Sequence, residues 1–153
     1  MARTSAGILL HRAAPGGTEV LIAHMGGPFW ARKDAGAWSI PKGEYDPATE
    51  DPLSAARREF REELGIDPPP GPYRELGTFS YSSGKQVTVF AADGADFEAS
   101  GLSFGVFALE WPPRSGRIQE FPEVDRVEWM PVDAARDKLV AGQRPALDGL
   151  GIA

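Results

Sequence analysis

Hydrophobic residues occur in short runs separated by turn-forming residues along most of the chain. Residues 5–13 and 18–25 are rich in aliphatic and β-branched residues, and the four residues APGG separate them. Two such runs joined by Pro and Gly are typical of a strand–turn–strand unit, and their hydrophobicity indicates that this hairpin lies in the core. Residues 37–43 are predicted to be extended, because Pro41 cannot continue a helix.

The rest of the chain alternates further apolar runs with helical patterns. Four more runs predict strands, at residues 74–81, 85–92, 103–111 and 126–131. Short terminal helices are predicted at residues 131–140 and 144–152. With a longer helix between the early and late strands, this order predicts an α/β fold in which helices pack on a mixed sheet. The length of 153 residues suits one domain, residues 1–153, with one core.

The longest helix is predicted between Asp51 and Gly65, and the sequence marks both of its ends. Asp51 is a favourable N-cap, Pro52 is tolerated at the first helical position, and Gly65 is typical of a C-terminal stop. Apolar residues recur three or four positions apart and form one stripe that must face a core: Leu53, Ala56, Phe60 and Leu64.

Three glutamates lie on another face of this helix. Glu59, Glu62 and Glu63 are spaced so that their carboxylates lie close together. Glu59 and Glu63 form a like-charge pair, which destabilises a helix by roughly 0.2–0.5 kcal/mol unless a bound cation neutralises it. The alternative is an ordinary solvated face, since Glu and Arg favour helices and Arg58 can pair with Glu62.

Composition narrows the chemistry that the chain can perform. There are no cysteines, which excludes disulfides, thiolate metal sites and cysteine nucleophiles, and two histidines are too few for a histidine-rich metal site. The net charge of −6 argues against a nucleic-acid partner, which is bound through clustered Lys and Arg. No membrane span or secretory signal is recognisable, so we expect a cytoplasmic protein without a membrane partner.

A longer pattern includes the helix glutamates and makes the solvated-face alternative a poor explanation. Residues 58–66, REFREELGI, combine Arg-Glu-apolar, Glu-Glu and Gly-apolar at fixed spacing. This signature resembles the Nudix box, the metal-binding loop–helix–loop of the Nudix hydrolases (MutT-like proteins). Gly43 stands at the opening glycine of the box and Glu50 at the acidic residue before the helix. Six residues separate them, whereas the family pattern has five, so we interpret the difference as a one-residue loop insertion.

The resemblance implies a fold, a cofactor and roles for single residues. The fold would be the Nudix α/β/α sandwich, with the box helix packed on a mixed β-sheet. Mg²⁺ or Mn²⁺ would be bound by the backbone carbonyl near Lys42 and Gly43 and by three box carboxylates, those of Glu59, Glu62 and Glu63. Such cations prefer oxygen ligands and bridge to phosphate oxygens. Arg58 would hold a box glutamate in place, Glu59 would bind metal or orient water, and Glu50 and Gly65 would be structural.

Residues outside the box are further candidates. Many relatives carry an extra glutamate that reaches the metals from a segment after a later strand, and Glu120 and Glu123 stand in that region. We favour Glu120 as the general base because it lies in a polar run, although an exposed glutamate needs no functional explanation. Lys42 is a candidate for contacting phosphate as a point charge, with a solvated lysine as the alternative.

Aromatic side chains are candidates for stacking on a base, although each is more often part of the core. The candidates are Trp30, Trp38, Trp111 and Tyr81. Tyr81 stands near the position at which dinucleoside-polyphosphate hydrolases of the family tend to carry a tyrosine. Residues 38–43, WSIPKG, resemble the segment that opens the box in the same group and in diphosphoinositol-phosphate relatives. Trp38 and Tyr81 are therefore the preferred substrate-binding aromatics.

These resemblances imply a metal-dependent pyrophosphohydrolase that uses metal-activated water. We expect a small-molecule nucleotide substrate, with dinucleoside polyphosphates or oxidised and ordinary nucleoside triphosphates favoured over ADP-ribose and diphosphoinositol phosphates. The alternative is a regulatory module that binds nucleotides without catalysis, but such modules usually lose box carboxylates, and all three helix glutamates are present. The sequence does not decide between a monomer and a homodimer, because one sequence does not reveal a dimer face.

Overall fold

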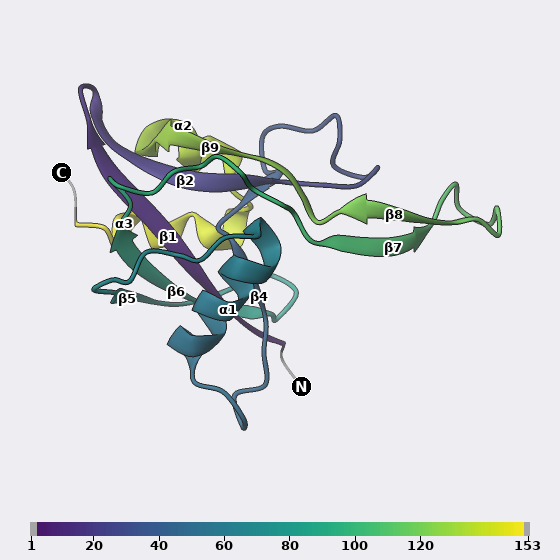
Figure 1. Ribbon diagram of the computed structural model, residues 1–153, viewed down its shortest axis with the longest axis horizontal. Helices are drawn as coiled ribbons and strands as arrows, with labels where there is room; N and C mark the ends of the chain where they lie inside the picture. Colours follow the sequence, from purple (N-terminus) through teal and green to yellow (C-terminus); the bar gives the residue numbers. More distant parts are fainter. Residues whose placement is uncertain (1–2, 152–153) are drawn as a thin grey trace.

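The computed structural model describes residues 3–151 and has a mixed β-sheet at its centre (Figure 1). Seven strands form this sheet: β1 (Thr4–Ala14), β2 (Gly17–Met25), β3 (Trp38–Ser39), β4 (Lys42–Glu44), β5 (Arg74–Ser80), β6 (Gln86–Asp93) and β9 (Val124–Pro131). The main path is β3-β2-β1-β6-β5, with β4 also pairing with β1 and β9 with β2. The β1–β6 pair is parallel, and the other strand pairs of this sheet are antiparallel.

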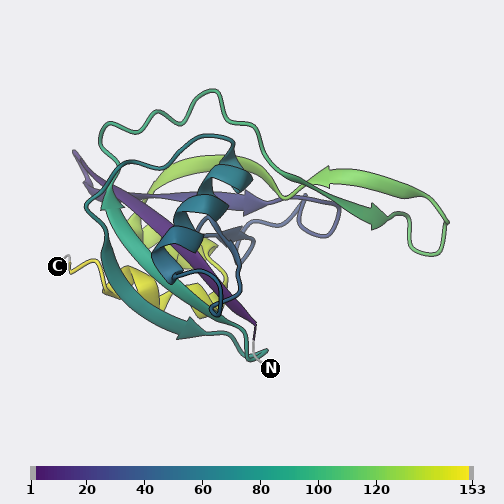
Figure 2. The same ribbon diagram turned by 60° about the horizontal axis from the view of Figure 1, so that its bottom comes forward.

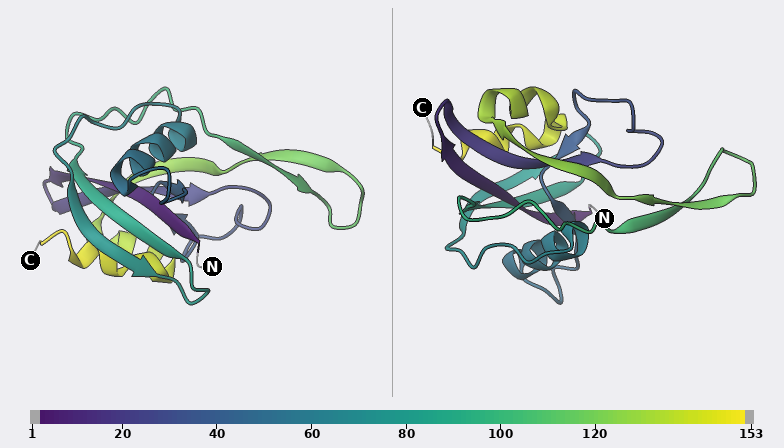
Figure 3. Two further views of the ribbon diagram at one scale, coloured as in Figure 1. Left: turned by 90° about the horizontal axis from the view of Figure 1, so that it is seen from below. Right: turned by 45° about the horizontal axis from the view of Figure 1, so that its top comes forward.

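Helices cover both faces of the sheet (Figure 3). One face carries α1 (Pro52–Leu64), which contacts β1, β4 and β6. The opposite face carries α2 (Val132–Lys138), the 3₁₀-helix η1 (Ala141–Gln143) and α3 (Pro145–Asp148). The structure thus confirms the predicted α/β/α sandwich with the central helix packed on a mixed sheet.

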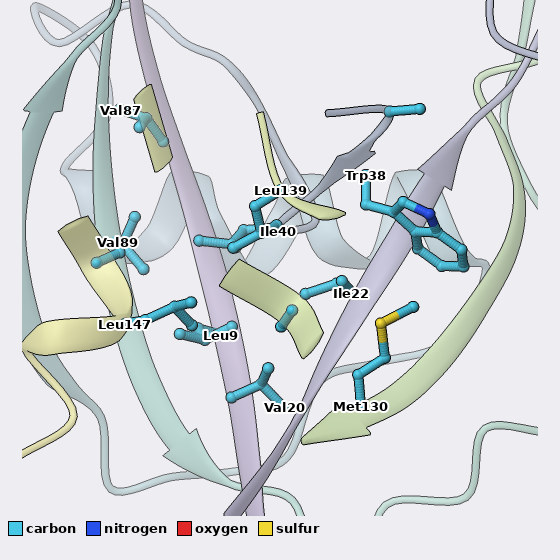
Figure 4. Packing of buried hydrophobic residues seen from close by; sticks show 13 residues of the cluster. Leu9, Val20, Ile22, Trp38, Ile40, Val87, Val89, Met130, Leu139 and Leu147 are labelled. Carbon is cyan, nitrogen blue, oxygen red and sulfur yellow. The ribbon is translucent and has the colours of Figure 1, made fainter. Parts of the chain in front are cut away.

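The central strand β1 is buried on both faces and separates two hydrophobic clusters. Ile8 and Leu10 belong to the cluster beneath α1, together with Phe60. Leu9 points to the opposite side and belongs to the cluster beneath α2 and α3 (Figure 4). This alternation follows from the two-residue period of a strand. Trp38 belongs to the second cluster.

Helix α1 begins and ends where its sequence predicts. The Asp51 side chain accepts a hydrogen bond from the Ser54 backbone N–H at 3.0 Å, which caps the first turn. Gly65 ends the helix with a φ of 79°, a left-handed conformation that favours glycine. The predicted apolar stripe faces the sheet, with Phe60 fully buried.

Two strands form a separate ribbon that projects from the rest of the molecule (Figure 2). These strands are β7 (Val106–Glu110) and β8 (Ile118–Pro122). The sequence predicted a strand at 103–111 but none at 118–122. That omission was wrong: Phe121 pairs with Phe107, and this pairing across the ribbon is not visible in a locally polar stretch.

The C-terminal helix is shorter than predicted. α3 ends at Asp148, whereas the predicted helix ran to residue 152, which lies outside the described residues. Gly149 and Gly151 fall within the predicted range, and glycine disfavours a helix interior. Within residues 3–151, no helix is long and apolar enough to span a membrane.

Candidate active site

Strand β4 and helix α1 meet at a cavity of about 530 Å³ beside the ends of β2 and β9. The cavity wall combines carboxylates, lysines and apolar side chains. Its carboxylates are those of Glu44, Glu59, Glu63 and Glu123, its lysines are Lys42 and Lys85, and its larger apolar side chains are those of Met25, Trp30, Tyr81 and Phe107.

The opening glycine of the box is in contact with the first helix glutamate. Gly43 pairs with Ala6 of β1, which places β4 directly beside α1. A Cβ atom on Gly43 would lie 2.0 Å from Oε2 of Glu59, so any other residue here would displace this carboxylate from its position. The backbone of β4 and the helix carboxylates are therefore neighbours.

Two carboxylates of α1 are held in an unfavourable electrostatic environment. Burial raises the pKa of Glu63 to about 8; Lys42 opposes this shift, and the carboxylates of Glu123 and Glu59 add to it. Burial also raises the pKa of Glu59, against the opposing effect of Arg58. A cation bound here would favour the ionised form of both carboxyl groups.

Glu123 adds a carboxylate to the cavity from outside α1. It lies between β8 and β9, where its backbone N–H donates to Gly105 O at 2.8 Å and its carbonyl accepts from Gly26 N at 2.9 Å. Glu120 lies on β8 opposite Ala108, is exposed, and does not line the cavity. The geometry therefore favours Glu123 over Glu120, against our preference from sequence. The sequence does not show where β8 ends and β9 begins, so it gives no means of choosing between Glu120 and Glu123.

Arg58 binds three glutamates around the start of the site. It donates to Glu50 through Nε at 2.9 Å and Nη2 at 2.8 Å, and its Nη1 donates to Glu59 at 2.8 Å. Nη1 also donates to Glu62 at 3.1 Å, on the exposed side of α1 and outside the cavity wall. The hydrogen bond from Arg58 lowers the pKa of Glu50. The extra loop residue is accommodated by a turn in which Glu50 N donates to Asp46 O at 3.1 Å.

Two lysines enter the cavity from different elements. Lys42 lies on β4, and Lys85 precedes β6. Among residues 3–151, neither lysine forms an ion pair with a carboxylate. Our sequence reasoning considered Lys42 and missed Lys85, for which the only local signal is its place in the polar turn YSSGK.

A second cavity, of about 470 Å³, adjoins the first. Both cavities are lined by Met25, Ser39, Lys42 and Tyr81. The second is completed by Ser82 and by residues 140–143, which include Gln143 of η1. Our sequence reasoning missed Gln143, because no motif marks it.

The four candidate aromatics have different surroundings. Trp38 is 1% exposed and donates through Nε1 to Asp34 at 2.9 Å, so it is a core residue and lines neither cavity. Our assignment of Trp38 to the substrate therefore has no support in the geometry. Trp111 packs against Phe29, with ring centroids 5.3 Å apart. Trp30 and Tyr81 do line the first cavity.

The donors in this cavity suit a hard divalent cation. Glu59, Glu63 and Glu123 offer only carboxylate oxygens, as Mg²⁺ and Mn²⁺ prefer. Within residues 3–151, no three His, Asp or Glu side chains are arranged to hold a metal by themselves. The remaining ligands would come from backbone carbonyl, water and phosphate oxygens, which Mg²⁺ commonly keeps.

The NUDIX domain profile matches residues 1–150, so the chain belongs to the NUDIX family. Hydrolases of this family generally need divalent metal ions. An 8-oxo-(d)GTP phosphatase of Mycolicibacterium smegmatis is 35% identical over 107 residues, which are 67% of this chain and 26% of that protein. An uncharacterised 17.7 kDa protein of Enterobacteria phage T4 is 43% identical over 54 residues, 35% of this chain and 36% of that protein. The chain thus matches only about a quarter to a third of the length of these relatives.

Solved structures confirm the Nudix fold. The NUDIX domain of Shewanella oneidensis NrtR, complexed with ADP ribose, superposes with a TM-score of 0.63 at 14% identity, covering 99% of this chain and 87% of that one. A C. elegans Ap4A hydrolase has a TM-score of 0.60 at 22% identity, covering 96% and 95%. A MutT protein of Methanosarcina mazei has a TM-score of 0.60 at 21% identity, covering 96% and 91%.

Proposed function

We propose that this protein is a pyrophosphohydrolase that cleaves a phosphoanhydride bond of a nucleotide with the help of Mg²⁺ or Mn²⁺. The observation that carries the proposal is one cavity that brings four carboxylates together with Lys42 and Lys85. Among residues 3–151, neither lysine forms an ion pair with a carboxylate. Carboxylates suit the cations that accompany phosphates, and lysines suit the phosphate oxygens themselves. The combination is what a polyphosphate chain requires.

The residues that line the cavity would have different roles. A cation bound beside Glu59, Glu63 and the Gly43 backbone would neutralise phosphate oxygens and lower the pKa of the attacking water. Lys42 and Lys85 would bind the phosphate oxygens. Glu123 would accept the proton of the attacking water, because it lines the same cavity as Glu59 and Glu63 but is not part of α1.

The favoured substrates are nucleoside triphosphates, ordinary or oxidised, and dinucleoside polyphosphates. The likeness to an 8-oxo-(d)GTP phosphatase over 67% of the chain supports the triphosphates. The second cavity next to the lysines supports a substrate with a base attached to several phosphates. The structural likeness to an Ap4A hydrolase concerns the fold and does not choose between these substrates.

The test is product release from a substrate panel. The panel contains GTP, 8-oxo-dGTP, diadenosine tetraphosphate, ADP-ribose and a diphosphoinositol phosphate, each with Mg²⁺, with Mn²⁺ and with a chelator. Wild type is compared with Glu63→Gln and with Glu128→Gln, an exposed carboxylate on β9 outside the cavity. We expect metal-dependent turnover that is lost in Glu63→Gln and kept in Glu128→Gln. Nucleotide binding without turnover in any of the proteins would instead favour a regulatory module.

A further inference from the structure

Tyr81 lies where the two cavities meet and is held there by η1. Its ring rests against Gly142: a Cβ atom on that glycine would lie 2.1 Å from Cδ1 of Tyr81. Its backbone is fixed by the turn before β6, in which Tyr81 N donates to Lys85 O at 2.8 Å. The phenol is therefore a placed group and not a freely rotating side chain.

The buried amide of Gln143 determines how the Tyr81 hydroxyl is oriented. Gln143 is 0% exposed, and its Oε1 accepts from the backbone N–H of Ile40 at 2.7 Å. A backbone N–H can only donate, so this contact fixes which side of the amide carries oxygen. Nε2 then donates to Ser39 Oγ at 2.9 Å and to Tyr81 Oη at 2.8 Å. Both amide hydrogens are used, and Gln143 has none left for a ligand.

Because Tyr81 accepts this hydrogen bond, its own hydroxyl hydrogen must point elsewhere. Within residues 3–151 the structure shows no protein acceptor for it. Ser39 is no alternative donor, since its hydroxyl donates to Ile40 O at 2.8 Å. The side-chain hydrogens left free where the cavities meet are those of Tyr81 and of the Lys42 ammonium. A ligand at this place must present hydrogen-bond acceptors.

We propose that Gln143 is a positioning residue that makes Tyr81 a directed hydrogen-bond donor to a nucleobase in the second cavity. The base presents a keto oxygen or an unprotonated ring nitrogen to Tyr81, while its phosphates extend past Lys42 into the first cavity. A base suits the second cavity because none of the described residues lines it with a carboxylate, and Met25, Val140 and Ala141 give it apolar surface. The inference rests on the proposed function only in that the first cavity takes the phosphates of a nucleotide.

The experiment measures binding instead of turnover. Dissociation constants are determined by calorimetry with Mg²⁺ for the β,γ-methylene analogues of GTP and ATP and for inorganic tripolyphosphate, which has no base. The proteins are wild type, Tyr81→Phe, Gln143→Met and the double variant. We expect each single variant to weaken binding of at least one methylene analogue about three- to tenfold, the value of one hydrogen bond. The double variant should lose no more than either single variant, and tripolyphosphate binding should not change.

Three results would overturn the proposal. Equal weakening of tripolyphosphate binding would show that Tyr81 contacts phosphate, and unchanged analogue binding by Tyr81→Phe would show that it contacts no ligand. Losses that multiply in the double variant would show that Gln143 acts independently of Tyr81. If Gln143→Met does not fold, Gly142→Ala is used instead. Its added Cβ displaces the Tyr81 ring, so this variant must weaken binding of the analogues. Failure of the hydrolase proposal would appear separately, as absent turnover with these constants still measurable.

Discussion

Arg58 donates hydrogen bonds to both carboxylate oxygens of Glu50, with Nε 2.9 Å from Oε2 and Nη2 2.8 Å from Oε1. This pair forms although six residues separate Glu50 from Gly43. The turn at Asp46 takes up the additional length before the helix begins. The same guanidinium reaches Glu59, so Glu50 holds the arginine that in turn contacts a cavity carboxylate.

We predict that Glu50→Gln lowers catalytic efficiency by about tenfold and raises the Mg²⁺ concentration needed for half-maximal rate, as loss of a residue supporting a ligand does. Arg58 would lose a charged partner and bind Glu59 and Glu62 more strongly, in competition with a cation. The measurement is a Mg²⁺ titration of the initial rate. Glu19→Gln, which removes the partner of Arg12 outside the cavity, is the matched control. An unchanged Mg²⁺ titration in Glu50→Gln would contradict the prediction.

Gly43→Ala should reduce the rate by about a hundredfold, because the new Cβ would occupy the position of the Glu59 carboxylate. Loss of a residue that places a metal ligand commonly has effects of this size. Rate and unfolding midpoint are measured together. Gly16→Ala, for which no atom of residues 3–151 other than its chain neighbours lies within 4 Å of the added Cβ, should leave both unchanged. A fully active Gly43→Ala variant would show that the close approach has no part in the site.

The two candidate bases can be separated by matched substitutions. Glu123→Gln should lower kcat by about 10²–10⁴-fold, the usual contribution of a general base. Glu120→Gln should leave kcat unchanged, because Glu120 is exposed on β8 outside the cavity. The measurement is kcat at saturating substrate for both variants. A larger loss of kcat in Glu120→Gln than in Glu123→Gln would identify Glu120 as the base and contradict the prediction.

Two tryptophans should differ in what they contribute. Trp38→Phe should lower the free energy of unfolding by about 1–3 kcal/mol, since it removes buried volume and the hydrogen bond to Asp34, with KM unchanged. Trp30→Ala should raise KM because Trp30 lines the first cavity. Urea unfolding and steady-state kinetics of both variants test this difference. A raised KM with unchanged stability in Trp38→Phe would instead support the prediction from sequence that Trp38 contacts the substrate.

The N-cap of α1 should make stability depend on acid pH. Hydrogen bonds from the backbone N–H and then the hydroxyl of Ser54 hold the pKa of Asp51 below its usual value. A carboxyl whose pKa is lowered on folding stabilises the protein above its unfolded pKa of about 3.9, and this contribution disappears as pH falls through the folded value. Asp51→Asn keeps a good cap without the charge. The stability difference between the two proteins, followed by urea unfolding from pH 7 to pH 2.5, should therefore shrink at the acid end.

Features that depend on neighbouring residues in the sequence were predictable. The caps of α1, its buried stripe and the hairpin of β1 and β2 follow from residue type and spacing alone. The box pattern likewise indicated Gly43, Glu59, Glu62 and Glu63. The fold brings Gly43, Glu59 and Glu63 to one cavity, whereas Glu62 does not line it. Local rules suffice here because α1 and β4 are close in the chain as well as in space.

Features that depend on distant contacts were not predictable. Gln143 accepts a hydrogen bond from Ile40, which lies more than a hundred positions away in the sequence, and no local pattern predicts such a partner. Trp38 was assigned to the substrate because a motif contains it, yet tertiary packing places it in the core. The choice between Glu120 and Glu123 depended on where the ribbon ends, which strand propensity does not determine.

The parallel pairing of β1 with β6 bears on how the protein folds. Thr4 pairs with Gln86, so more than half of the chain lies between two residues that pair at the centre of the sheet. Closing such a long loop costs conformational entropy before the favourable contacts between the strands form. Proteins rich in distant contacts fold in milliseconds to seconds. Helix α1 lies entirely within that loop and buries its stripe only against the completed sheet. We therefore expect the α1 carboxylates to reach their places in the cavity only after this distant pairing has formed.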